Sequence, residues 1–129
     1  MESGLRRWHE VVERRDPGLL ADLLTPDAVF VSPVLHRPVV GRDLVILYLS
    51  GAMHVLGVGS EFQYVREVAS GDTAVLEFET VVDGLTVNGV DMIRFDDGGR
   101  ITEFKVMLRP LSGLLAVKER MAALLTQGT

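Results

Sequence analysis

Asp91 is the residue of this sequence whose position most needs a chemical explanation. It lies within Val90-Asp91-Met92, where strand alternation places its carboxyl group on the same face as Ile93 and Phe95. Desolvation on such an apolar face raises the pKa of a carboxyl group, which suits a general acid or a neutral hydrogen-bond donor. The alternative is a structural role, in which Asp91 bonds to Trp8 or to a helix backbone amide, or opens to water.

Histidines are the residues that could supply a base beside such an acid, because histidine titrates near neutral pH without perturbation. His36 lies in a loop after the first expected strand, and His54 lies near the end of an apolar helix. Either could instead be a surface residue, and His9 is expected to face solvent. No His-x-x-x-His pattern or carboxylate cluster indicates a metal site, and no cofactor is expected. The chain has no cysteine, so a thiolate site is excluded.

Helices expected from the apolar spacing hold several of these residues. Apolar residues recur at helical intervals over 2–15, 42–56 and 111–125. Asp16-Pro17 is typical of the start of one more helix, which we expect to end at 25–27. Ser3 is the expected cap of the first helix. The single tryptophan, Trp8, lies on the apolar side of that helix as a core anchor or a pocket wall.

Strands are predicted wherever apolar and polar residues alternate. The expected strands are 28–32, 62–68, 73–82, 87–95 and 101–108. Asp96-Asp97-Gly98-Gly99 is the expected tight turn between the last two strands. Helices kept apart from four long antiparallel strands predict one α+β domain over residues 1–129. We expect the twisted sheet to curl into a cone whose apolar interior opens at one end.

Three stretches resemble the nuclear-transport-factor-two-like superfamily, also called SnoaL-like. They are Asp16 to Leu24 leading into Asp27-Ala28-Val29-Phe30-Val31-Ser32-Pro33, then Val40-Gly41-Arg42-Asp43, and then Asp91 to Asp96 with Gly99-Arg100-Ile101. The resemblance covers nearly the whole chain and implies a cystatin-like α+β roll. It implies function only weakly, because this scaffold hosts isomerases, hydrolases, cyclases and transport factors.

Ketosteroid isomerases of that superfamily offer the sharpest comparison. Their chemistry uses a carboxylate base together with a Tyr and a protonated Asp that hold an oxyanion, and that Asp is a known example of a carboxylic acid kept neutral by an apolar site. The resemblance places Asp91 at the position of the oxyanion-holding Asp, Ser32 at that of the base and Trp8 at that of the Tyr. Serine cannot shuttle the proton unaided, and indole only donates. Steroid isomerisation is therefore disfavoured. Epoxide hydrolysis is disfavoured because that chemistry resembles an Asp–Arg–Asp set, and here no second inward acid pairs with Asp91 and Arg94 faces the opposite side.

The expected pocket takes a small hydrophobic ligand. We expect it to be lined by Ser32, Tyr48, Leu76, Phe78, Ile93, Phe95, Phe104, Val106 and Leu108, although Tyr48 could instead be core. One hypothesis is an isomerase, cyclase or hydrolase acting on an apolar carbonyl compound, with Asp91 as acid or oxyanion partner, Trp8 as orienter and His36 or His54 as base. A second is a ligand-binding protein without chemistry. A third is an interaction module that uses the outer face of the sheet.

Charge and composition restrict the partners. The formal net charge is −5 and no run of five like charges occurs, which argues against a nucleic-acid partner. No apolar stretch of ~18 residues is present, so no membrane partner is expected, and the protein is expected in the cytoplasm. Val75, Val81, Met92 and Met107 add apolar surface to the outer sheet face. They predict a homodimer that packs through the convex face of the sheet.

Overall fold

The fold pairs four α-helices with a six-stranded sheet, in a computed structural model that describes residues 1–57 and 61–127. The helical elements are α1 (Glu2–Arg14), the short 3₁₀ turn η1 (Pro17–Leu19), α2 (Leu20–Leu23), α3 (Arg42–Gly57) and α4 (Leu111–Gln127). The strands are β1 (Leu24–Val31), β2 (Val39–Val40), β3 (Gln63–Ser70), β4 (Thr73–Val82), β5 (Leu85–Phe95) and β6 (Ile101–Arg109). This arrangement confirms the predicted α+β class.

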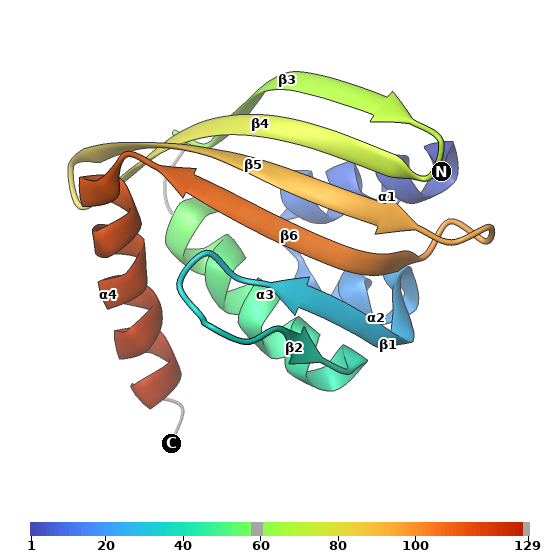
Figure 1. Ribbon diagram of the computed structural model, residues 1–129, viewed down its shortest axis with the longest axis horizontal. Helices are drawn as coiled ribbons and strands as arrows, with labels where there is room; N and C mark the ends of the chain where they lie inside the picture. Colours follow the sequence, from blue (N-terminus) through green and yellow to red (C-terminus); the bar gives the residue numbers. More distant parts are fainter. Residues whose placement is uncertain (58–60, 128–129) are drawn as a thin grey trace.

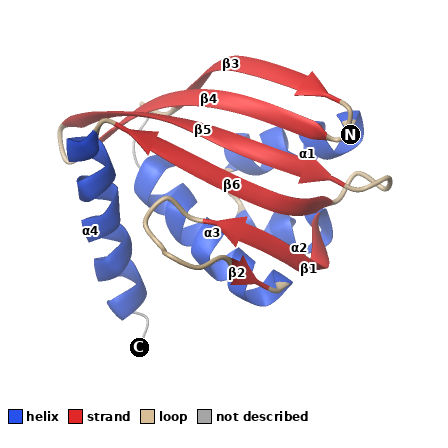
Figure 2. Ribbon diagram, viewed as in Figure 1, coloured by secondary structure: helices blue, strands red, loops and turns tan. Residues whose placement is uncertain are grey.

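The sheet is mixed and mostly antiparallel, with strand order β2-β1-β6-β5-β4-β3. Only the pairing of β1 with β6 is parallel; every other neighbouring pair runs antiparallel. Helices α1, α2 and α3 lie against one side of the curved sheet, and α4 stands at one end (Figure 1). Colouring by element type shows that the other side of the sheet carries no helix (Figure 2). The interior of the fold therefore lies between the sheet and α1–α3.

The hairpin between β5 and β6 forms where the sequence predicts it. Its turn is held by the Asp96 carboxylate, which accepts hydrogen bonds of 2.9 Å from the backbone N–H groups of Gly98 and Arg100. Gly99 adopts a positive φ of 80°, a conformation that residues with a Cβ rarely take. Alternation along β5 is strict, because Val87, Gly89, Asp91, Ile93 and Phe95 are all buried. The predicted inward direction of Asp91 is thus confirmed.

Three local predictions were wrong. The helix expected after Asp16 ends at Leu23, because Leu24 already pairs with Ile101 of β6 and is fully buried in the sheet. Pro26 follows in the irregular part of β1, where the register shifts and a missing N–H costs no ladder bond. The segment before Gly41 contains the unexpected short strand β2. Finally, α1 begins at Glu2 after Met1, without a side-chain cap from Ser3.

No helix of the described residues is both long enough and apolar enough to cross a membrane.

Candidate functional site

A cavity of about 750 Å³ lies between α1, α3 and the inner face of β3–β6. Its apolar lining comprises Trp8, Val12, Leu49, Ala52, Met53, Leu56, Phe62, Phe78, Phe104 and Val106. Its titratable lining residues are His9, Glu13, Arg15, His54, Tyr64 and Asp91. Pockets for small organic ligands have about this volume and combine apolar walls with a few converging polar groups.

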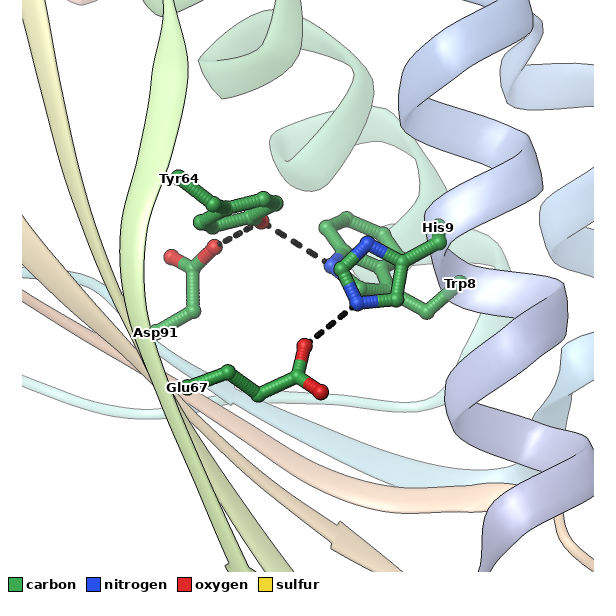
Figure 3. Close-up of polar contacts among 5 residues, drawn as sticks. All are labelled: Trp8, His9, Tyr64, Glu67 and Asp91. Carbon is green, nitrogen blue, oxygen red and sulfur yellow. Dashed lines mark hydrogen bonds and ion pairs between the residues drawn. The ribbon is translucent and has the colours of Figure 1, made fainter.

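Three polar side chains form a hydrogen-bonded chain in the wall of this cavity (Figure 3). The Tyr64 hydroxyl donates to Oδ2 of Asp91 over 2.5 Å. The indole Nε1–H of Trp8 donates to the same Tyr64 oxygen over 3.0 Å. Trp8 and Asp91 are buried, at 2% and 5% exposed, whereas Tyr64 is only partly buried. We call Trp8, Tyr64 and Asp91 the polar triad.

Aromatic packing fixes the members of the polar triad. The Trp8 ring meets Phe104 of β6 edge to face, with ring centroids 4.7 Å apart. The Tyr64 ring contacts Phe62 and Phe78 edge to face, at 5.2 and 6.3 Å. Such edge-to-face arrangements are the favoured geometry for aromatic pairs. The hydroxyl of Tyr64 is consequently held at the end of a rigid ring.

Gly89 on β5 makes room for this packing. It lies opposite Phe78 in the β4–β5 pairing, and a Cβ added there would come within 2.4 Å of the Phe78 ring and 2.7 Å of Leu108. Only a residue without a side chain lets the Phe78 ring lie over the β5 backbone. The glycine two positions before Asp91 therefore shapes the wall on which Asp91 stands.

A β-bulge in β3 decides which of its side chains face the cavity. In the β3–β4 register Tyr64 pairs with Phe78, but the next partners are Arg66 and Glu77, so Val65 is the extra residue. Without the bulge, Tyr64 and Arg66 would share a face. With it, Tyr64 and Glu67 both face α1, where Trp8 and His9 meet them. Bulges commonly redirect side chains in this way beside functional sites.

Burial dominates the electrostatics of the polar triad. Desolvation raises the pKa of Asp91 from its ordinary 3.8 to about 7, and the hydrogen bond from Tyr64 opposes that rise. Burial, followed by the nearby charge of Asp91, raises the pKa of Tyr64 well above its usual range. Tyr64 is accordingly a donor at every physiological pH, and Asp91 changes between a neutral acid and a carboxylate near neutrality.

A second polar pair lies beside the triad. Nε2 of His9, the residue after Trp8 on α1, is 2.5 Å from Oε1 of Glu67 on β3. Their side chains are 33% and 41% exposed, so the pair is more open to solvent than Asp91. The His9 ring also meets the Tyr64 ring edge to face at 5.6 Å. His9 therefore stands beside the polar triad and lines the same cavity.

The structure brings only some of the expected site residues together. Asp91, Trp8, His54, Phe78, Phe104 and Val106 line the cavity. Ser32 and Leu108 instead border a smaller void of about 20 Å³, which adjoins the cavity because Ala52, Leu56 and Val106 line both. The Ser32 hydroxyl accepts a hydrogen bond from the backbone N–H of Val34. Leu76, Ile93 and Phe95 are core residues, at most 3% exposed, and do not line the cavity. His36 is exposed in the loop before β2, and Tyr48 is partly buried outside the cavity lining.

Tyr64, His9 and Glu67 are site residues that the sequence reasoning missed. Trp8 reaches Asp91 only through Tyr64, so the direct Trp8–Asp91 bond considered from the sequence is not formed. Alternation through Tyr64, Arg66 and Val68 is unbroken in the sequence and conceals the bulge at Val65, which turns Glu67 toward α1. Among the described residues, no group of three His, Asp or Glu side chains could hold a metal ion.

Comparisons with known proteins identify the family of the chain and support its fold. The family model described as a SnoaL-like domain matches residues 5–104. The chain belongs to the SnoaL-like family. No curated protein matches the sequence.

Two solved structures resemble this SnoaL-like chain over nearly its whole length. One is described as a steroid delta-isomerase from Pseudomonas aeruginosa; it is 44% identical, the match covers 98% of this chain and 91% of that one, and the TM-score is 0.92. The other is an uncharacterised bacterial protein with a cystatin-like fold from Silicibacter pomeroyi, 34% identical over 98% of this chain and 87% of its own, with a TM-score of 0.89.

An NTF2-like protein of unknown function from Mesorhizobium loti, 23% identical with a TM-score of 0.71, covers 84% of this chain and 90% of its own. At that identity the likeness bears on the fold alone. It supports the assignment of this SnoaL-like chain to the cystatin-like architecture.

Proposed function

We propose that the protein is an enzyme that binds an apolar carbonyl compound in the cavity and catalyses its enolisation, with Asp91 and Tyr64 holding and protonating the carbonyl oxygen. The observation that carries this proposal is the polar triad, whose members Trp8 and Asp91 are buried in a largely apolar cavity wall. Isomerisation and cyclisation of ketones both pass through an enol or enolate. The proposal thus names the step that such reactions share.

The number of hydrogens in the triad explains how it would act. When Asp91 is ionised, the single Tyr64 hydroxyl hydrogen is committed to its carboxylate. When Asp91 is protonated, Asp91 and Tyr64 carry two hydrogens, of which their mutual bond uses one. The other can be donated to a ligand oxygen in the cavity. Trp8 supports this arrangement because its N–H bond polarises the Tyr64 hydroxyl.

The pKa of Asp91, about 7, suits this role. A general acid works best when its pKa lies near the operating pH, because a useful fraction is then protonated and still releases the proton readily. The name of the 44% identical protein from Pseudomonas aeruginosa, a steroid delta-isomerase, supports a ketone as substrate. Serine is not basic at neutral pH, and Ser32 borders the smaller adjoining void, so the base must come from another residue.

The second candidate is a carrier that binds a hydrophobic ligand without changing it. It is favoured by the serine at position 32, since a cavity without a base at this position can still bind a carbonyl compound. The two functions differ only in turnover. Mass spectrometry of the ligand after long incubation separates them, because only the enzyme leaves a product or exchanges carbon-bound hydrogen for deuterium.

The proposal is tested with two probes, cyclohexenone in D₂O for turnover and naphthol for binding. Naphthol is a phenol whose oxygen resembles that of an enol. Asp91→Asn keeps the shape but loses the transferable proton, so deuterium exchange should fall ~100-fold. Tyr64→Phe should weaken naphthol binding about tenfold, since it removes one hydrogen bond. Tyr48→Phe, a matched change outside the cavity lining, should alter neither measurement.

Circular dichroism and thermal unfolding show whether each variant is folded. Full turnover in folded Asp91→Asn would refute the proposed chemistry. Loss of turnover that occurs only together with loss of fold would refute it as well.

We also propose that two copies of the chain pair through the outer sheet face. Val68 pairs with Val75, Val75 with Met92 and Met92 with Lys105, which makes one row across the face that no helix covers. Val68 is 58% exposed, a large apolar surface for a strand residue. Val68→Glu should shift the sedimentation coefficient from dimer to monomer, whereas Leu115→Glu on α4 should not. A monomeric wild-type protein would contradict the pairing.

A further inference from the structure

Enolisation needs a base as well as an acid, and the paired histidine beside the polar triad meets that need. We propose that His9, oriented by Glu67, is the base that removes the proton from the carbon next to the substrate carbonyl group. This inference rests on the proposed function, and it assigns a task to two residues that lie outside the triad.

The carboxylate of Glu67 determines which nitrogen of His9 is available. An ionised carboxylate accepts hydrogen bonds and donates none, so the His9 nitrogen 2.5 Å from Oε1, which is Nε2, must carry the hydrogen. A neutral imidazole bears only one N–H group, and Nδ1 therefore holds the free electron pair. A carboxylate that fixes the tautomer and stabilises the protonated ring is the usual means of orienting a histidine base.

The location of His9 links it to the triad. Its ring lines the same cavity as Asp91 and Tyr64, and it meets the Tyr64 ring edge to face at 5.6 Å. Trp8 and His9 are consecutive on α1 and point toward β3 side by side (Figure 3). The bulge at Val65 gives each of them a partner, because it turns both Tyr64 and Glu67 toward α1. The bulge in β3 therefore places Tyr64, which bonds to Asp91, and Glu67, which bonds to His9, on the same face of the strand.

Two other cavity residues are weaker candidates for the base. His54 is exposed on α3, and within residues 1–57 and 61–127 no partner orients its ring. Glu13 is exposed near the end of α1. Among the described residues, neither His54 nor Glu13 has a partner that orients its side chain, whereas Glu67 orients the ring of His9.

The proposed step transfers two protons, one from the substrate to His9 and one from Asp91 to the substrate. Nδ1 of His9 takes the proton from the carbon next to the carbonyl group, and the C–H electron pair forms the carbon–carbon double bond. The carbonyl π electrons move to oxygen, which receives the proton of neutral Asp91. The products are an enol, an imidazolium paired with Glu67 and a carboxylate that accepts the Tyr64 hydrogen bond. Return of the His9 proton to carbon, and of the enol proton to Asp91, restores both residues.

The test combines kinetics with a direct reading of the histidine tautomer. His9→Gln should lower deuterium exchange into cyclohexenone ~100-fold, the lower end of what a general base contributes. Glu67→Gln should lower it about tenfold, as expected when a positioning carboxylate is lost but the base stays. His36→Gln, a change on the exposed loop before β2, serves as the matched control and should leave exchange unchanged. Naphthol binding should survive in His9→Gln, since the triad is intact.

Nitrogen-15 NMR reads the tautomer on which the proposed base depends, and lost exchange with retained naphthol binding in His9→Gln is the result that a purely structural role would not give. The chain has three histidines, so single His→Gln variants assign all the ring signals. Neutral His9 should show the tautomer with hydrogen on Nε2, and Glu67→Gln should let the other tautomer appear. Hydrogen on Nδ1 in the wild type, or exchange within twofold of wild type in folded His9→Gln, would overturn the assignment.

Comparison with Asp91→Asn separates this inference from the proposed function. If exchange is lost in Asp91→Asn but kept in His9→Gln, the proposed function stands and His9 is not the base. If exchange is lost in His9→Gln but kept in Asp91→Asn, the role of the triad fails while His9 remains the base. If the wild-type protein exchanges no deuterium above buffer, both are overturned.

Discussion

Burial of Asp91 should make the protein less stable as the pH rises through neutrality, and Asp91→Asn should remove that loss. The folded protein keeps the proton on Asp91 up to pH values near 7, whereas the unfolded chain releases it near the ordinary pKa of 3.8. Between these values the folded state binds more protons than the unfolded state. The free energy of unfolding therefore falls as the pH rises from about 4 to about 7, and levels off above 7.

The size of the effect follows from the two pKa values. Each pH unit between them costs ~1.36 kcal/mol. From pH 5 to pH 8 the contribution of Asp91 should thus lower the free energy of unfolding by roughly 3 kcal/mol. Asparagine has the same shape and does not titrate, so the advantage of Asp91→Asn over wild type should grow by that amount over the same range.

Urea unfolding at pH 5 and at pH 8 measures this difference. Trp8 is the only tryptophan and is buried, so its fluorescence reports unfolding directly. Asp97→Asn makes the same chemical change at an exposed position of the β5–β6 turn and serves as the control. If the difference between Asp91→Asn and wild type changes by less than about 1 kcal/mol, Asp91 is ionised throughout this range and the argument from desolvation is refuted.

Two further substitutions test the packing and hydrogen bonding of the site. Tyr64→Phe should raise the pKa of Asp91 further, because the Tyr64 hydrogen bond lowers it; a ¹³C carboxyl titration that shows no increase would contradict this. Gly89→Ala should lower the free energy of unfolding by ~1–3 kcal/mol, because its Cβ would overlap the Phe78 ring. Gly57→Ala, whose Cβ would meet nothing within 4 Å among the described residues, is the control. Equal stabilities of the two variants in urea unfolding would show that Phe78 moves aside without cost.

The sequence predicted most of the fold because its patterns are local and regular. The strand expected at 73–82 and the turn at Asp96–Gly99 match the structure, since strict alternation and Asp-Gly turn chemistry each specify one local geometry. The error after Asp16 has a tertiary cause. Leu19, Leu20, Leu23 and Leu24 continue a helical spacing, but Leu24 gains more by pairing with β6 in the sheet than by extending a four-residue helix.

The site was harder to predict than the fold, for a different reason. Asp91 could be found from its own strand, because an acid among apolar residues is anomalous without knowledge of its neighbours. Tyr64 and Glu67 could not, because their direction depends on a bulge that the sequence does not mark with Gly or Pro. The resemblance predicts Ser32 in the pocket, whereas in the structure it lines only the smaller void that adjoins the main cavity.

These departures are connected, because the polar groups of the cavity lie mainly on the side formed by α1 and β3. A base at the end of β1 would approach a ligand from the position of Ser32, which lies outside the cavity here. The polar groups gather instead where α1 faces β3, as Trp8 with Tyr64 and His9 with Glu67. Of the three residues placed by resemblance, Asp91 on the central strand β5 and Trp8 on α1 line the cavity, whereas Ser32 does not. A substrate that places its oxygen near Asp91 would then present its acidic carbon toward α1 and β3. The reaction should therefore depend on the bulged part of β3 more than on the end of β1.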